Sequence, residues 1–225
     1  HKKKPIDEDL DEMVYNIQEV ELSTKELPSI SSKTLQKYLQ ATNRSVLLVD
    51  LRSRESFNTN HIINKFLINI DPNLLSTNKQ DLTEDSLEKV LKKILKSQVP
   101  DNSNVNAELD EEEDRDLITV KNTYNYFKQR HKFHLIVYYT DAETWSLFNN
   151  ERVLFNYLQL FYDLIYKDKP TNASKSRKLT KPPKVLENGF ESWLSLLESQ
   201  NLENLDDEKD ASQLSPNDFS NYYVA

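Results

Sequence analysis

The sequence predicts an α/β domain: a mainly parallel central sheet with helices on both faces and an inserted helical and acidic segment. Strand and helix candidates alternate along the chain, which favours parallel strands joined by right-handed helical crossovers. The strand candidates are short, continuous apolar runs, which is typical of strands covered on both faces. They lie at residues 46–50, 66–70, 133–139 and 185–186.

The first part of the chain is expected to supply an acidic segment and one helix before the first strand. Residues 1–27 are acidic, with a short helix candidate at 10–20. Ser31 or Ser32 is in a position to cap a helix whose apolar stripe begins at Leu35.

The first strand is followed by a short helix and then by an insertion. Ser53 is expected to cap a helix at 53–58. Residues 71–116 form the insertion, in which 85–96 has the apolar spacing of an amphipathic helix. The acidic run at 108–116 is typical of a solvated loop.

The second half of the chain continues the alternation. Helices are expected at 119–130, 143–166 and 191–198, and a basic, proline-containing loop at 169–183. We therefore expect an acidic N-terminal segment at 1–27, a domain at 28–198 and a disordered tail or linker at 199–225.

Composition excludes several classes of function. The 225 residues carry a net charge of −8, which argues against nucleic acid as a partner. No apolar run is long enough to span a bilayer and no signal peptide is apparent. Because the chain begins at His1 rather than Met, we expect it to be a piece of a longer protein. It contains no Cys, so it has no disulfide, no thiolate metal site and no cysteine nucleophile.

Gly189 is the only glycine in the chain, and it stands between the last strand candidate and the last helix candidate. A tight strand-to-helix turn needs a residue with positive φ, which glycine adopts without steric cost. Asn188 precedes it, and Asn tolerates the left-handed region best after Gly. We therefore predict a fixed turn at these two residues.

Two motifs in order resemble the rhodanese-like family. The first is an apolar strand ending in Asp50-x-Arg52, with Glu55, Phe57 and His61-Ile62 downstream. The second resembles that family's closing motif of strand, glycine turn, aromatic residue and Trp. It is formed by Leu186, Asn188, Gly189, Phe190 and Trp193, with Asn188 in place of the family's first glycine.

A closer resemblance is to the rhodanese-like domains in the non-catalytic part of fungal ubiquitin-specific proteases linked to endosomal sorting. It rests on residues 48–58, 139–142 and 185–190. The resemblance implies a protein-interaction or targeting domain of a cytoplasmic deubiquitinase, peripheral at endosomes. The Cys and His boxes of the thiol protease itself are absent from this chain.

The loop after the central strand is expected to be a degenerate active-site loop. It consists of residues Thr140, Asp141, Ala142, Glu143, Thr144 and Trp145. A sulfurtransferase needs a thiolate here, inside a cradle of backbone N–H groups. Thr140 cannot carry persulfide sulfur, and Asp141 and Glu143 repel an anion, so we predict no sulfurtransferase or cysteine-phosphatase chemistry. A Thr140 hydroxyl that serves as a loop or capping hydrogen-bonding group is the favoured interpretation.

Several residues are interpreted as structural. We expect Asp50 to accept hydrogen bonds at the strand end, Arg52 to pair with a carboxylate, and His61 to close its loop through a backbone hydrogen bond. The signature residues expected to hold the fold are Asp50, Arg52, Glu55, Phe57, His61, Gly189 and Trp193. No metal site and no cofactor are predicted, because the four His residues are scattered.

Three surfaces compete as the partner-binding site of a domain that is monomeric by expectation. The first is Trp145 with Phe190 beside it. The second is Lys181-Pro182-Pro183, which has the composition of a polyproline ligand for an SH3-containing sorting or adaptor protein. The third is the apolar stripe of the insertion. Two alternatives to docking remain: an autoregulatory domain of the protease, or a hydrolase that uses Thr140 and Asp141 on the same scaffold.

Overall fold

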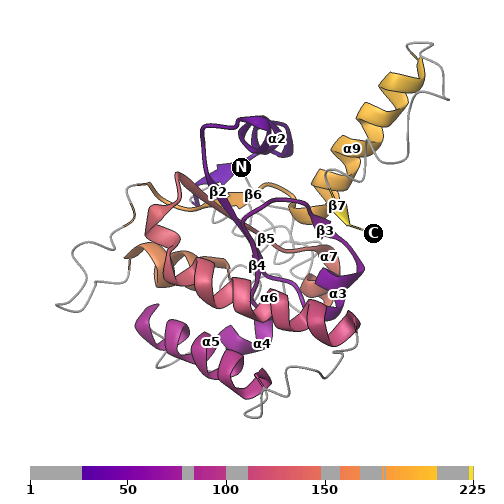
Figure 1. Cartoon of the computed structure of the whole chain (residues 1–225). Coiled ribbons are helices and arrows are strands. Elements are labelled where there is room, and N and C mark those ends of the chain that lie inside the picture. The colour runs from indigo at the N-terminus through magenta and orange to yellow at the C-terminus, as the bar shows by residue number, and fades with distance from the viewer. Residues whose placement is uncertain are drawn as a thin grey trace, which may run out of the picture.

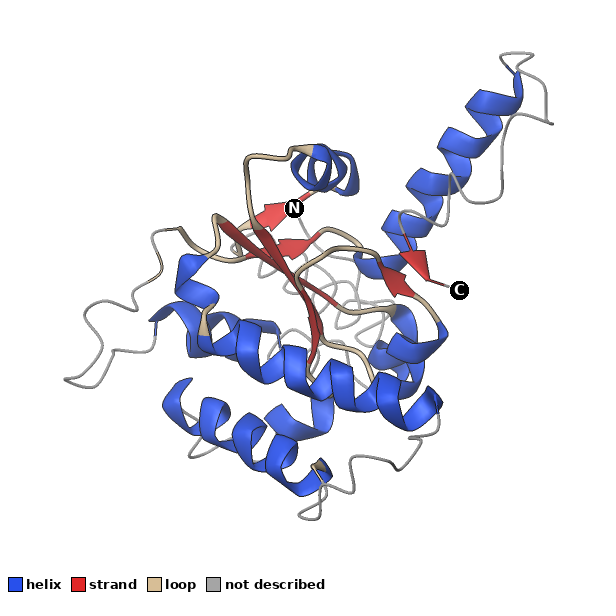
Figure 2. Ribbon diagram, in the orientation of Figure 1, coloured by secondary structure: helices blue, strands red, loops and turns tan. Residues whose placement is uncertain are grey.

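A computed structural model describes residues 27–77, 84–99, 111–147, 158–167, 179, 181–206 and 223–224. It shows an α/β fold with a five-stranded parallel sheet in the order β1-β6-β5-β2-β4 (Figures 1 and 2). The strands are β1 (Ser29–Ile30), β2 (Val46–Asp50), β4 (Leu67–Asn69), β5 (Leu135–Tyr139) and β6 (Lys184–Leu186). A second, two-stranded antiparallel sheet joins β3 (His61–Ile62) to β7 (Tyr223–Val224).

Helices cover both faces of the main sheet, as the sequence predicts. The helices are α2 (Ser32–Gln40), α3 (Arg54–Thr59), α4 (Pro72–Thr77), α5 (Glu84–Gln98), α6 (Glu111–Lys128), α7 (Ala142–Leu147) and α9 (Gly189–Asp206). A 3₁₀ turn η1 (Arg130–Lys132) precedes β5, and residues 158–162 are helical and continue into the π turn η2 (Asp163–Lys167). None of these described helices is long and apolar enough to cross a bilayer.

The continuous apolar strands are buried because each face of the sheet has its own core. Alternate residues of a strand point to opposite faces. Leu47 and Val49 of β2 pack with α5, α6 and the helical residues after 158. Val46 and Leu48 pack with α2 and α9 on the other face. Every residue of β2 and β5 is therefore buried.

The local capping signals act as expected. The Ser31 hydroxyl accepts a hydrogen bond from Thr34 N at 3.2 Å and caps α2. The Ser53 hydroxyl does the same for Ser56 N at 3.2 Å at the start of α3. These caps satisfy backbone N–H groups that have no partner within the helix.

Three element boundaries differ from the expectation. Residues 111–116 belong to α6, so the second half of the acidic run is helical rather than loop; acidic side chains in a first turn interact favourably with the helix dipole. The helix expected at 143–166 changes into the π turn η2 at Asp163, and its middle part, 148–157, lies outside the described residues. The closing helix α9 continues past residue 198 to Asp206, into the part expected to be tail. The helix candidate at 10–20 and most of the basic loop lie outside the described residues.

Candidate functional site

The carboxyl ends of the parallel strands meet at one edge of the sheet, called here the carboxyl edge. Asp50, Tyr139 and Asn69 are level with one another there, because Asp50 pairs in register with both other residues. In open parallel sheets this is the edge where ligand sites form. The loops that follow β2, β5 and β6 all leave from it.

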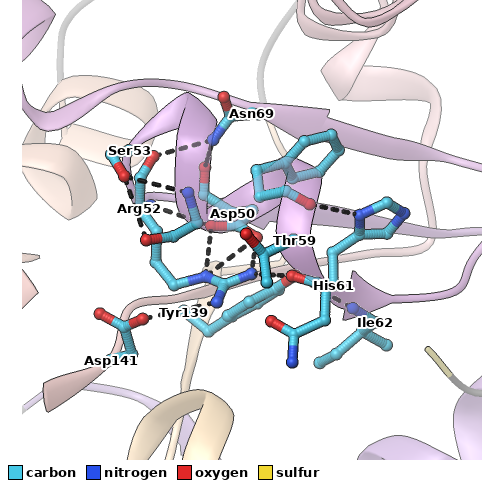
Figure 3. Close-up of polar contacts among 12 residues, drawn as sticks. Asp50, Arg52, Ser53, Thr59, His61, Ile62, Asn69, Tyr139 and Asp141 are labelled. Atoms are coloured by element: carbon cyan, nitrogen blue, oxygen red, sulfur yellow. Dashed lines mark hydrogen bonds and ion pairs between the residues drawn. The ribbon is translucent and has the colours of Figure 1, made fainter. Parts of the chain in front are cut away.

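Asp50 and Arg52 form a buried ion pair at the end of β2 (Figure 3). The Asp50 carboxylate accepts hydrogen bonds from Arg52 N at 2.9 Å, Arg52 Nε at 3.1 Å and Arg52 Nη2 at 2.8 Å. Both side chains are almost completely buried. Asn69 was not singled out from the sequence. Its amide Nδ2 donates to the carbonyl oxygens of Asp50 and Arg52 at 3.1 and 2.9 Å and holds this turn against β4.

The remaining donors of Arg52 are also used. Arg52 Nη2 donates to the carbonyl oxygen of Asn60 at 2.5 Å, and Arg52 Nη1 lies 3.4 Å from Asp141 Oδ2. The guanidinium carbon lies 4.2 Å from the centroid of the Phe190 ring. Burial acts against the charge, but the Asp50 carboxylate outweighs it and raises the pKa of Arg52. Arg52 therefore ties three loops together, and these contacts use four of its five guanidinium N–H groups.

The loop after β5 is occupied by carboxylates of the chain itself. Asp141 Oδ1 accepts hydrogen bonds from Thr144 N at 2.8 Å and Thr144 Oγ1 at 2.7 Å, so Asp141 caps α7. Glu191 Oε1 accepts from Ala142 N at 2.6 Å. In an anion-binding loop these N–H groups would face the ligand. Here two of them are already paired with negative charge.

Thr140 differs from its expected role. Its carbonyl oxygen accepts from Phe190 N at 2.9 Å, but its buried hydroxyl has no hydrogen-bond partner among the described residues. The cap of α7 is Asp141 instead, because a carboxylate one residue closer to the helix reaches the N–H of its third residue. A hydroxyl without a contacting base is not an activated nucleophile.

The turn at Asn188 and Gly189 packs directly on this loop. Asn188 has φ 57° and Gly189 has φ 64°, and the turn joins β6 to α9. A Cβ atom at Gly189 would lie 2.5 Å from the carbonyl oxygen of Thr140. The close approach brings the Glu191 carboxylate to the backbone N–H of Ala142. The turn at Asn188 and Gly189 therefore determines which group occupies the loop after β5.

The other signature residues support the same region. Phe57 is buried and its ring stacks on His61 at 4.3 Å between centroids. His61 Nδ1 lies 2.7 Å from the carbonyl oxygen of Phe57, and burial lowers the pKa of His61. Trp193 of α9 is buried against the sheet, whereas Glu55 is exposed in the first turn of α3. Among the described residues no group of acidic or His side chains could hold a metal ion.

The candidate partner-binding residues do not gather at one place. Phe190 is 3% exposed, so it supports Arg52 rather than forming a surface; this corrects the expectation. Trp145 lies in α7, but its side chain is outside the described part. Lys181 is exposed and Pro182 half-buried, but Pro183 is buried because it leads directly into β6. The proline pair thus cannot present both rings to an SH3 domain.

Glu191 is the site residue that sequence reasoning missed. The sequence places it only in the first turn of the last helix, where acidic residues are common. Its contact with Ala142 spans 49 positions and depends on the fold. The available signal was its position two residues after Gly189, which directs it toward the loop after the neighbouring strand.

Fold and site together define an α/β domain with a parallel sheet whose carboxyl-edge loop contains no thiol and is closed by internal carboxylates. No family model matches the chain. Over 181 residues, 79% of this chain, it is 31% identical to ubiquitin carboxyl-terminal hydrolase 7 of Saccharomyces cerevisiae. The matched region covers 12% of that hydrolase. The chain is thus similar to a small region of a deubiquitinase.

Proposed function

We propose that the chain is a rhodanese-like, non-catalytic protein-interaction domain of a deubiquitinating enzyme whose thiol-protease part lies outside this sequence. The observation that carries the proposal is the filled loop: Ala142 N and Thr144 N are bonded to Glu191 and Asp141. A persulfide or phosphate group would need those N–H groups and a thiolate, and the chain has no Cys. Because a domain of this kind cannot bind the anionic group, we infer that its role is to recognise a protein partner.

Two further observations support the rhodanese-like assignment. Asp50 and Arg52 lie at the end of an inner strand, and the Asn188-Gly189 turn contacts the loop at Thr140. The similarity to part of ubiquitin carboxyl-terminal hydrolase 7 supports the deubiquitinase context. In that context the domain acts in the cytoplasm, peripheral at endosomes, and binds a protein partner. An SH3 domain would have to rely on Lys181 and Pro182, since Pro183 is buried.

The proposal is tested by looking for turnover. The purified chain is incubated with thiosulfate and cyanide, with aryl phosphates and with aryl esters, and compared with the Thr140→Ala variant. We expect no turnover above buffer for either protein. Turnover by the unmodified chain that Thr140→Ala abolishes would overturn the proposal, because it would make Thr140 a nucleophile.

A second experiment tests the recognition role. A fluorescent fusion of the chain is expressed in yeast and its distribution is compared with that of the fluorescent protein alone. Enrichment of the fusion at endosomes is expected, and the diffuse pattern of the fluorescent protein alone would contradict the targeting role.

A further inference from the structure

Several positively charged side chains lie at one edge of the main sheet. The segments that enter four of the five strands contain cations and no carboxylate; they are residues 41–45 before β2, 63–66 before β4, 129–134 before β5 and 181–183 before β6. Because all four strands are parallel, their starts lie at one edge. This amino edge is opposite the candidate site. Although the chain has a net charge of −8, this edge thus carries a group of positive charges.

These cationic segments are neighbours in space. His134 N donates to the carbonyl oxygen of Ser45 at 2.9 Å, which places Arg44 beside the start of β5. Lys181 Nζ lies 3.2 Å from His134 Nε2. On the other side, the rings of Phe66 and Phe133 are 5.0 Å apart, next to Lys65 and Lys132. With strands about 4.8 Å apart, β6, β5, β2 and β4 spread these cations over roughly 15 Å.

The cations of this edge are not neutralised within the described part of the chain. Arg130 is the exception, since it is buried and lies 3.7 Å from Glu88. No described carboxylate pairs with Arg44, Lys65, Lys132 or Lys181. Arg44 and Lys65 instead stand over the rings of Tyr38 and Phe66 at 5.4 and 5.3 Å. These four cations are exposed.

Four carboxylates with hydrogen-bond partners in the described part of the chain lie away from this edge. At the carboxyl edge Asp141 and Glu191 accept the loop hydrogen bonds, and Glu187 accepts one from Ser29 Oγ at 3.1 Å. Asp116 of the acidic run accepts from Asn58 Nδ2 at 3.1 Å, next to α3. Since these four carboxylates are already engaged, they are poor counterparts for the amino edge of a second copy of the chain.

We propose that the basic edge, defined as Arg44, Lys65, Lys132, His134 and Lys181, binds an extended acidic segment of a partner protein. This deepens, and rests on, the proposed recognition function. Roughly 15 Å corresponds to four or five extended residues, with side chains two positions apart on the same side. Carboxylates at alternate positions of such a segment match cations that come from successive strands.

An anionic membrane is the less favoured counterpart. The chain as a whole is strongly negative, and stable membrane binding usually combines basic residues with an apolar anchor. The large apolar side chains exposed in the described part, Val99, Ile118, Tyr166 and Leu202, are not in the segments of the basic edge.

The test measures the binding of a fluorescein-labelled peptide of four Glu-Ser repeats to the full chain. Binding is followed by fluorescence anisotropy at about 50 and about 300 mM NaCl. The double variant Arg44→Glu/Lys181→Glu is compared with Lys89→Glu/Lys92→Glu, which makes the same charge change at exposed positions of α5. We expect about a tenfold loss of affinity for the first variant and less than about twofold for the second. Thermal melts by circular dichroism check that both variants fold.

Three results would overturn the inference: no binding of the peptide by the unmodified chain, equal losses in the two variants, or binding to vesicles with about 30% phosphatidylserine in place of the peptide. Each of these leaves the proposed function standing, because that function fails only through turnover at the loop or loss of targeting. The two proposals can therefore fail separately.

Discussion

At Gly189 the backbone has φ 64°, and an added Cβ atom would lie 2.5 Å from the carbonyl oxygen of Thr140. The neighbouring Asn188 has nearly the same φ, 57°, but already carries a side chain. The two residues therefore separate two effects. A substitution at Asn188 measures only the cost of the left-handed conformation. A substitution at Gly189 measures that cost together with the clash of the new Cβ atom with the backbone at Thr140.

We expect Gly189→Ala to lower the free energy of unfolding by about 2 to 4 kcal/mol, because strain at positive φ adds to a clash that backbone atoms must relieve. Asn188→Ala is the matched control, with an expected loss below about 1 kcal/mol. Urea unfolding followed by tryptophan fluorescence measures both. Equal losses would show that the contact with Thr140 is unimportant.

His61 provides a pH-dependent contribution to stability. Burial lowers its pKa below 6.5; the Phe57 carbonyl and Asp50 act in the opposite direction, and Arg52 and Arg115 act with burial. As the pH falls below 6.5, the unfolded chain takes up a proton that the folded chain does not yet bind. The stability that is present above pH 6.5 is therefore lost as the pH falls through the pKa of the folded state.

The prediction is a smaller loss of unfolding free energy between about pH 7 and about pH 5.5 in His61→Gln than in the unmodified chain. Urea unfolding at the two pH values measures it. Because the pKa of His134 is also lowered, His134→Gln is measured in parallel to remove that contribution. An unchanged pH dependence in His61→Gln would contradict the assignment.

At this scale the sequence predicts local contacts and misses distant ones. The sequence predicts that Asp50 accepts hydrogen bonds and that Arg52 pairs with a carboxylate, and the structure joins these two residues to each other. The positive φ of Gly189 follows from the lack of any other glycine. The contacts of Asp141 with Arg52 and of Glu191 with Ala142 join residues 89 and 49 positions apart. Only the strand order makes them neighbours.

Among the elements, α9 combines a buried and a projecting part. Its first half packs on the sheet through Trp193 and Leu197, whereas Leu202 is 62% exposed. Figure 1 shows the later turns of α9 extending away from the body of the molecule. The helix continues because no Gly or Pro follows residue 198 to stop it before Asp206.

We expect Leu197→Ala to cost about 2 to 5 kcal/mol, since it leaves a cavity under the helix. Leu202→Ala on the same helix should change the unfolding free energy by less than about 0.5 kcal/mol. Thermal or urea unfolding of the two variants measures the difference. A large loss for Leu202→Ala would mean that the outer turns of α9 pack against something that stabilises the fold.

Element type could be predicted better than element ends. The strands expected at 46–50 and 133–139 are apparent because all positions but Asp50 and His134 are apolar, and strands β2 and β5 lie within them. The start of α6 and the end of α9 lie in polar sequence, where no apolar period marks the boundary. The two-residue strands β1 and β3 are too short to leave any pattern, and they are fixed only by their neighbours.

Across the whole molecule, two sheets of very different size connect distant parts of the chain. The parallel sheet holds both cores, whereas the β3–β7 pair joins His61 and Ile62 to Val224 and Tyr223. This small sheet lies beside the start of α9, as Figures 1 and 2 show. Nothing in the sequence could predict it, because two residues far from β3 carry no pairing signal of their own.

A two-stranded pair of this length adds little stability by itself. We therefore expect removal of residues 207–225 to lower the unfolding free energy by less than about 1 kcal/mol, since both cores remain. Amide exchange should become faster in a peptide that contains His61 and Ile62, because β3 loses its strand partner, and stay unchanged in one from β5, Leu135–Tyr139. Hydrogen-exchange mass spectrometry of the full and truncated chains measures both.

Faster exchange in β5 would show that β7 supports the main sheet, and unchanged exchange in β3 would show that the two strands do not pair in solution.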